Sequence, residues 1–291
     1  MTPATIASLI DRDEMSALRV DPGFREAVER ATAESVAHFQ SLPPTYQWIT
    51  KDIGRAAICF IAVTMDLVGG LTVQALTAAC IRNEVSSAGR VHQVVRRCQE
   101  AGVLTIDDGP GIWTRRRARL GDDLIRLFRE RSLIDLRAML PLAPELAGAA
   151  ELAETDEGFA SYILSLSSIL TLRRDLFGSE DGSPLVHFLE REAGMLILFD
   201  LLGRQASTRD DLLEEAPISR YDLSRRYGVS RAHINKLLAE SGHTEGAGKD
   251  RIVFAPTLSE ALDSHFAAIF RLNRAAGQVL LSGWRPRSAR Q

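Results

Sequence analysis

The feature that most constrains the fold of this 291-residue chain is an internal repeat. A period of about half the chain indicates two copies of one structural unit, because each copy must bury equivalent faces. The number of residues between matching positions of the two copies is nearly constant: 135 from Asp21 to Asp156, and 143 from Ser87 to Ser230. Four segments recur in the same order: 21–43 at 156–178, 51–70 at 191–204, 85–99 at 229–241, and 111–128 at 250–270.

The repeat divides the chain into two halves, which we expect at 1–141 and 156–291, with a Pro- and Ala-rich linker at 142–155. Each half reads helix, helix, helix–turn–helix, hairpin, helix. The predicted fold is mainly α with small β-hairpin wings: two tandem winged-helix units with flanking helices, related by a pseudo-two-fold. Strand-type alternation is too sparse for an α/β sheet. A purely α-helical domain without a DNA role is the alternative.

In the first half, residues 71–85 are expected to form the supporting helix and the turn of a helix–turn–helix. Ser87 is well placed to cap the second helix of this motif, because its hydroxyl can accept an orphan backbone N–H. We call this second helix of each motif, usually termed the recognition helix, the reading helix. A strand, a DDGPG turn and a returning strand are predicted over 103–114, directly before several arginines. The inward stripe of the reading helix is predicted to be Val91, Val94, Val95 and Cys98.

The second half repeats this plan in a shorter form. Residues 222–227 are expected to form the supporting helix, and Ser230 the cap of the second reading helix. No Gly-Val-Leu strand follows that helix, so the wing at 243–254, with Lys249 and Arg251 near its tip, is predicted to be less complete. The inward stripe is predicted to be Ile234, Leu237, Leu238 and Ser241.

Basic residues are concentrated around both reading helices, although the net charge of the chain is −3. Residues 86–119 carry seven arginines against three acids, and residues 220–236 carry five bases against one acid. DNA affinity depends on the local field at the contact face, so an acidic average does not exclude it. Outward side chains of a reading helix reach base edges, and basic wings reach phosphates. The candidate DNA-binding residues are Ser87, Gly89, Arg90, Gln93, Arg96, Arg97, Arg115, Arg116 and Arg117 in the first half, and Ser230, Arg231, His233, Asn235 and Lys236 in the second.

Each half resembles a MarR-type winged-helix transcriptional regulator. The residues that carry the resemblance are SSAGRVHQVVRRCQEAGVLTIDDGPGIWT (86–114) and YDLSRRYGVSRAHINKLL (221–238). In that family the flanking helices form a homodimer whose two reading heads contact one duplex. The resemblance therefore implies a sequence-specific regulator of transcription that carries both heads in one chain. Its double-stranded DNA site would hold two half-sites about one helical turn apart.

Other classes of function find no support in the sequence. There is no GxxxxGK[ST], nucleophile elbow, CxxC or HExxH, so we expect no enzyme, cofactor or metal site. The N-terminus lacks signal-peptide features, and the most apolar run (56–68) is too short to cross a bilayer, which favours a cytoplasmic location. Cys59, Cys80 and Cys98 are interpreted as reduced core residues, with a redox-sensing thiol as the alternative. A protein-interaction scaffold, a small-molecule effector and a homodimer stay open.

Overall fold

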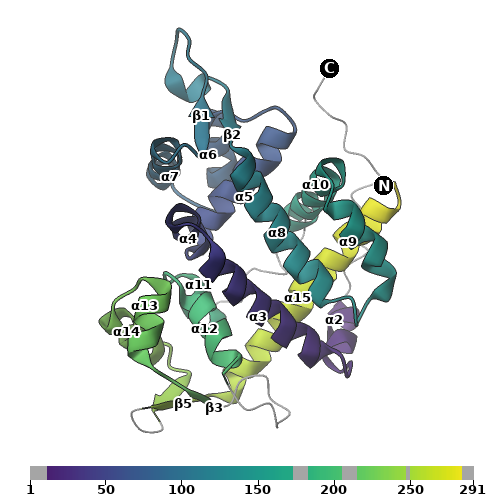
Figure 1. Ribbon diagram of the computed structural model, residues 1–291, viewed down its shortest axis with the longest axis vertical. Coiled ribbons are helices and arrows are strands. Elements are labelled where there is room, and N and C mark those ends of the chain that lie inside the picture. Colours follow the sequence, from purple (N-terminus) through teal and green to yellow (C-terminus); the bar gives the residue numbers. More distant parts are fainter. Residues whose placement is uncertain (1–11, 173–182, 205–214, 247–249, 284–291) are drawn as a thin grey trace.

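The computed structural model describes residues 12–172, 183–204, 215–246 and 250–283. Over these ranges the protein is mainly helical with two small antiparallel sheets, which confirms the predicted class in that form (Figure 1). The elements of the first half are α2 (Arg12–Arg19), α3 (Phe24–Ser41), α4 (Pro44–Thr50), α5 (Ile53–Leu67), α6 (Val73–Arg82), α7 (Ala88–Glu100), β1 (Leu104–Ile106), η1 (Trp113–Arg115), β2 (Ala118–Leu120) and α8 (Asp122–Ala138). Those that follow are η2 (Pro144–Leu146), α9 (Ala147–Ala153), α10 (Asp156–Leu172), α11 (Pro184–Leu189), α12 (Gly194–Leu202), β3 (Glu215–Pro217), α13 (Arg220–Tyr227), α14 (Arg231–Ala239), β4 (Thr244–Gly246), β5 (Arg251–Phe254) and α15 (Pro256–Leu281).

Hydroxyl caps define where the helix–turn–helix pairs begin. Ser87 accepts the backbone N–H of Arg90 at 3.4 Å, and Ser230 accepts that of His233 at 3.0 Å, so both predicted caps are confirmed. The supporting helices α6 and α13 are capped in the same way, by Thr72 and Ser219. Each cap satisfies one of the orphan donors of the first helical turn. All the predicted inward residues of both reading helices are buried.

The first hairpin differs from the prediction in where its chain returns. β1 pairs with β2 in the register Leu104 to Leu120, so the returning strand is Ala118–Leu120 and lies outside 111–114. Ala118 and Leu120 bury their side chains, whereas Trp113 is 40% exposed, and the pairing follows this apolar alternation. Arg115 to Arg117 are consequently part of the wing loop, in and just after the 3-10 turn η1. We call residues 71–120 the first unit.

The second hairpin is more complete than predicted. β3, β5 and β4 form a three-stranded antiparallel sheet in that order, with β5 in the centre. Ile252 and Phe254 are buried, which gives β5 an apolar face, and Ala216 of β3 packs into the same core. The prediction of a poorer wing was therefore wrong, because strand pairing is supplied by residues before α13. Lys249 lies outside the described residues. We call residues 215–254 the second unit.

The two halves pack against each other through α3 and α10, each of which also packs within its own half. α3 of the first half packs against α12 of the second, and α10 of the second half packs against α5 of the first. Phe39 of α3 stacks on Tyr227 at 5.5 Å between ring centroids, while Phe159 and Ile163 of α10 belong to the core of the first unit. Long helices α8 and α15 complete the central layer, which lies between the two units (Figure 1).

The segment 142–155 is an integral part of the core, so its interpretation as a linker was wrong. It forms η2 and α9, one face of which is buried, while Glu151, Leu152 and Glu154 are exposed. Small alanines allow close approach to α15, where Gly277 lies against Leu146 and Ala149. The alanine content therefore reflects tight helix packing. The buried residues are Ala143, Leu146, Ala149, Ala150 and Ala153.

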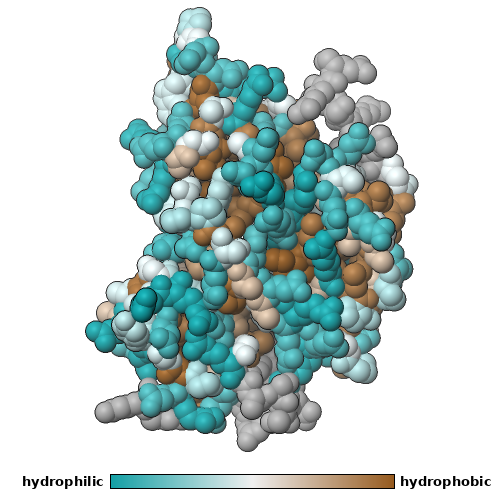
Figure 2. All heavy atoms as spheres, viewed as in Figure 1, coloured by the Kyte–Doolittle hydropathy of each residue, from teal (hydrophilic) through white to brown (hydrophobic). Residues whose placement is uncertain are grey.

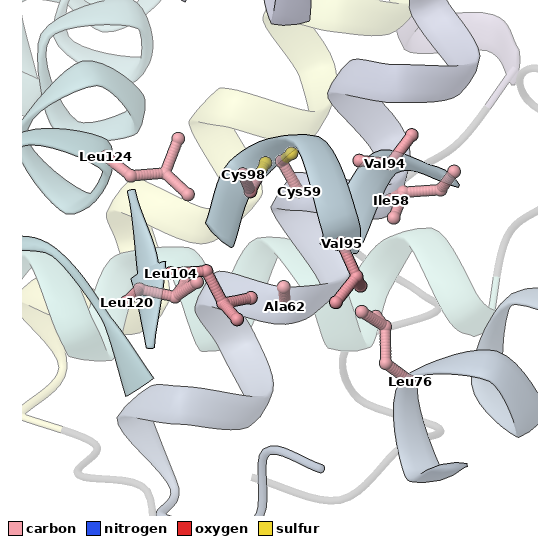
Figure 3. Close-up of a pocket in the computed structure, with 10 residues that line it drawn as sticks. All are labelled: Ile58, Cys59, Ala62, Leu76, Val94, Val95, Cys98, Leu104, Leu120 and Leu124. Carbon is pink, nitrogen blue, oxygen red and sulfur yellow. The ribbon is translucent and has the colours of Figure 1, made fainter. Parts of the chain in front are cut away.

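The core of the first unit is nearly filled. A void of about 10 Å³ between α5, α7 and the hairpin is lined by apolar side chains and by Cys59 and Cys98 (Figure 3). The three cysteines are free and buried, as predicted. The hydrogen bond with Cys98 and the burial of the sulfur together raise the pKa of Cys59, which keeps it a neutral thiol. No described helix is both long and apolar enough to span a membrane.

Candidate nucleic-acid interface

The outward face of α7 is open and polar. Gly89, Gln93 and Arg96 are exposed on the side opposite the buried valines. They contribute to a depression of about 350 Å³, whose other lining residues are His92, Arg97 and Glu100. Within the described part of the chain, neither the Gln93 nor the Arg96 side chain makes a hydrogen bond or an ion pair. These two side chains therefore retain their full hydrogen-bonding capacity for a partner.

Two other predicted contacts of α7 are held by the chain itself. Arg90 donates to both carboxylate oxygens of Asp52, at 2.6 and 2.7 Å. The guanidinium of Arg97 lies over the ring of Trp48, 4.3 Å from its centroid. Arg90 and Arg97 therefore fix α7 against α4 and the turn that follows it, and using either for DNA would require breaking that contact.

The wing of the first unit places its arginines beside the supporting and reading helices. Arg115 donates to the side-chain oxygen of Gln74 on α6 at 3.2 Å, and Arg116 donates to the carbonyl of Gly111 at 3.1 Å. Arg117 is exposed, and its backbone pairs with Thr72 before α6. The wing is also linked to α7, because Trp113 packs edge-on against His92. One basic surface thus extends from α7 to the wing.

The outward face of α14 is more occupied. Asn235 accepts a hydrogen bond from Arg220 at 2.6 Å, and Lys236 forms an ion pair with Glu240 at 3.7 Å. The ring of His233 contacts the carbonyl of Glu192 at 2.9 Å, which turns it inward. Arg231, at the first position of the helix, is exposed.

The two reading helices lie on the same side of the molecule. In Figure 1, α7 and α14 lie along the left edge of the view, with α4 and α11 between them. Figure 2 shows mainly hydrophilic residues over both helices on this face. A single linear partner could therefore contact both units.

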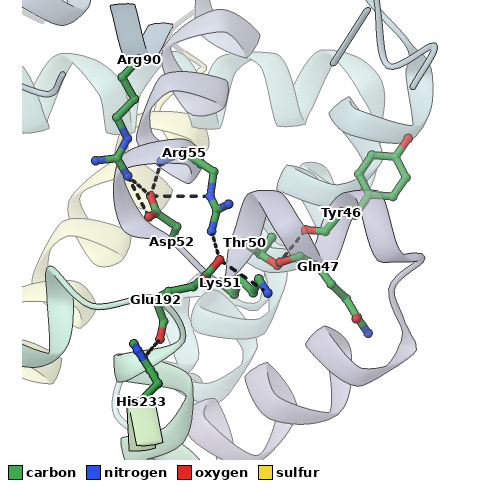
Figure 4. Close-up of polar contacts among 9 residues, drawn as sticks. All are labelled: Tyr46, Gln47, Thr50, Lys51, Asp52, Arg55, Arg90, Glu192 and His233. Carbon is green, nitrogen blue, oxygen red and sulfur yellow. Dashed lines mark hydrogen bonds and ion pairs between the residues drawn. The ribbon is translucent and has the colours of Figure 1, made fainter. Parts of the chain in front are cut away.

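A polar cluster between the units was not found from the sequence. Glu192 accepts from Arg55 at 2.6 Å and pairs with Lys51 at 3.5 Å (Figure 4). The Ala193 N–H also donates to the Lys51 carbonyl. Burial by itself raises the pKa of Glu192, but the hydrogen bond from Arg55 and the positive charges nearby outweigh it, so the pKa lies below its ordinary value. We call Lys51, Asp52, Arg55 and Glu192 the central clamp.

The central clamp connects the two reading helices. Asp52 binds Arg90 of α7, and the carbonyl of Glu192 binds His233 of α14. Arg90 and His233 are equivalent, since each is the third residue after a capping serine. The charged pair that recurs at 51–52 and 191–192 was the sequence signal for this cluster. A repeat alone, however, does not predict that its two copies are in contact.

Comparisons with protein-family models, curated proteins and solved structures give no match for this chain. The chemistry available on the face that carries α7 and α14 is positive charge and hydrogen-bond donation. Among the described residues, no group of three His, Cys, Asp or Glu side chains is arranged to hold a metal ion.

Proposed function

We propose that this protein is a sequence-specific double-stranded DNA-binding regulator of transcription that uses two winged-helix units in one chain. The observation that carries the proposal is a Ser-capped amphipathic helix, α7, whose outward Gln93 and Arg96 lie beside a basic wing. Glutamine and arginine can each make paired hydrogen bonds to a purine in the major groove. Arginines of the wing supply phosphate contacts, which give affinity and register.

The shared plan of the two units supports an internal duplication. In both, a short segment before the supporting helix pairs with the returning side of the hairpin. Thr72 forms a bridge with Arg117, just before β2, and β3 pairs with β5. The reciprocal packing of α3 and α10 supports the same origin, because it is how two identical chains would exchange helices in a symmetric dimer. A pseudo-two-fold would then bring both reading helices to one face.

The proposal is tested by measuring duplex affinity against salt concentration with the intact chain. We expect affinity to fall steeply as salt rises, because phosphate binding releases counterions. The Arg96→Ala/Lys236→Ala double variant should bind more weakly, by roughly tenfold or more. Arg30→Ala serves as a control, since it removes one charge from α3, where Arg30 is exposed and paired with Glu26.

A flat salt dependence, or unchanged affinity in the double variant, would reject DNA reading. A protein-interaction scaffold would then be the better description, and the same face would be its binding surface. A small-molecule effector has no place in the void of the first core, because about 10 Å³ is roughly the size of one water probe.

A further inference from the structure

We infer that one copy of the chain binds one non-palindromic duplex made of two unlike half-sites. In this arrangement α7 reads most of the sequence, and α14 mainly contacts the DNA backbone. The inference rests on the proposed function and specifies the class of DNA that it would recognise. It follows from a comparison of the two reading helices and their wings.

The outward faces of the reading helices differ at equivalent positions. α7 has 13 residues and α14 has nine, so the second helix offers about one turn less of outward surface. The loss falls where α7 carries its arginines. Counted from the capping serines, the equivalent outward residues are Gln93 and Lys236, Arg96 and Ala239, and Arg97 and Glu240.

The first unit retains groups that discriminate between bases. Arg96 has the planar fork that binds the O6 and N7 atoms of guanine, and Gln93 has the donor and acceptor that match adenine. Both are exposed and make no polar contact with the described chain. Gly89, one turn earlier, has no atom within 4 Å of the position where a Cβ would stand, so the backbone there is open to close approach.

The second unit retains groups that suit phosphates. Lys236 carries a single point charge on a flexible side chain and already forms an ion pair with Glu240, so it discriminates weakly among bases. Asn235 is engaged by Arg220, and Ala239 has no polar atom to offer. Arg231 at the start of α14 is exposed and well placed for a backbone phosphate.

The wings reinforce this difference. From Asp107 to Leu120 the first wing has four arginines against two aspartates. From Thr244 to Phe254 the second wing has two bases against two acids, and Arg251 is paired with Glu215. The first unit therefore supplies the larger local positive field, and with it more of the electrostatic affinity.

The central clamp fixes how the two unlike surfaces are presented. Ion pairs of Lys51 and Arg55 with Glu192, and contacts of Asp52 and Glu192 with the two reading helices, hold α7 and α14 in one relative position. A symmetric dimer reads an inverted repeat because its two heads are identical. Here the second half of an inverted repeat would meet a helix that lacks the arginine needed to read it.

The test is selection of bound duplexes from a random-sequence library by the intact chain, followed by the mass of the complex in sedimentation. We expect a motif in which one half carries most of the information, and a complex of one chain with one duplex. An inverted repeat, or two chains on each duplex, would overturn the inference. Binding that enriches no motif would overturn it as well, whereas no binding at all would reject the proposed function itself.

Single variants separate the two roles on the selected duplex. Arg96→Ala should weaken binding to the preferred site by about tenfold to a hundredfold and erase the preference at one or two positions. Lys236→Ala should weaken binding less, equally for matched and mismatched duplexes, and lower the salt slope by about one. Arg30→Ala controls for charge. If Lys236→Ala instead erased a base preference as large as that lost in Arg96→Ala, α14 would be an equal reader and the inference would be wrong.

Discussion

The two units share one backbone plan but differ in what their repeated residues hold in place. Asp200 of α12 is buried and accepts from Arg204, Arg226 and the Tyr227 hydroxyl, so it fastens the supporting helix α13. The equivalent Asp66 of α5 is half-buried and accepts the backbone N–H of Leu120 at 3.3 Å, which fastens the returning strand of the wing. The same position of the repeat thus stabilises a different element in each unit.

Truncating the aromatic residues that pack across the two halves should have the largest effect. Phe39→Ala removes the ring that stacks on Tyr227, and Phe159→Ala removes a fully buried ring from the core of the first unit. Each should lower the free energy of unfolding by about 3–5 kcal/mol. Hydrogen exchange should show Phe39→Ala loosening the second unit and Phe159→Ala loosening the first, although each ring comes from the opposite half. If each variant loosened only its own half, the stabilisation of each unit by a ring from the opposite half would be refuted.

Removing the buried carboxylate should come next. In Asp200→Ala two guanidinium groups and the Tyr227 hydroxyl lose their common acceptor, which should cost about 3 kcal/mol. Asp66→Ala is the matched variant and should cost less, about 1 kcal/mol, because the carboxylate is half-exposed and accepts a backbone N–H. Urea unfolding of both variants measures the difference. Equal losses would show that the two positions do not differ in their structural role.

Neutralising Glu192 should have a smaller, pH-dependent effect. Its side chain is 39% exposed, so Glu192→Gln should cost no more than about 1 kcal/mol at neutral pH. Because the folded-state pKa lies below the ordinary value of 4.5, the stabilisation is present above that pH and is lost as the pH falls through the lowered pKa. Wild type and variant should therefore converge in acid unfolding experiments. A gap that persists at the lowest pH would mean that the charge of Glu192 is not what holds the clamp.

The capping serines should give the smallest effects. Ser230→Ala removes a 3.0 Å cap from a nine-residue helix and should cost about 1 kcal/mol. Ser87→Ala removes a longer, 3.4 Å contact from a 13-residue helix and should cost less. Thermal unfolding with each serine also changed to Thr, which preserves the hydroxyl, supplies the control. A larger loss of stability in Ser87→Ala than in Ser230→Ala would show that the cap distance does not determine how much each serine stabilises its helix.

Local signals predicted the elements better than their arrangement. The capped helices, their inward stripes and the two hairpins follow from hydroxyl placement and apolar spacing, which act within about ten residues. The position of the returning strand in the first wing, and the presence of a third strand in the second sheet, depend on which apolar residues become buried in a core. The sequence pattern therefore placed the returning strand of the first wing too early, and it missed the third strand of the second sheet. The same holds for Arg90, whose partner Asp52 lies 38 residues away.

Local patterns in the sequence were sufficient to place the starts of the two Ser-capped helices, α7 and α14, and to identify which of their faces are buried. These properties follow from hydrogen bonds and periodicity within each segment. Long-range contacts instead pack α3 and α10 against the opposite halves, bring residues 142–155 into the core, and join the units through the central clamp. Such contacts join residues more than a hundred positions apart, as Arg55 and Glu192 show, and their energy comes from burial and charge pairing that no local pattern records.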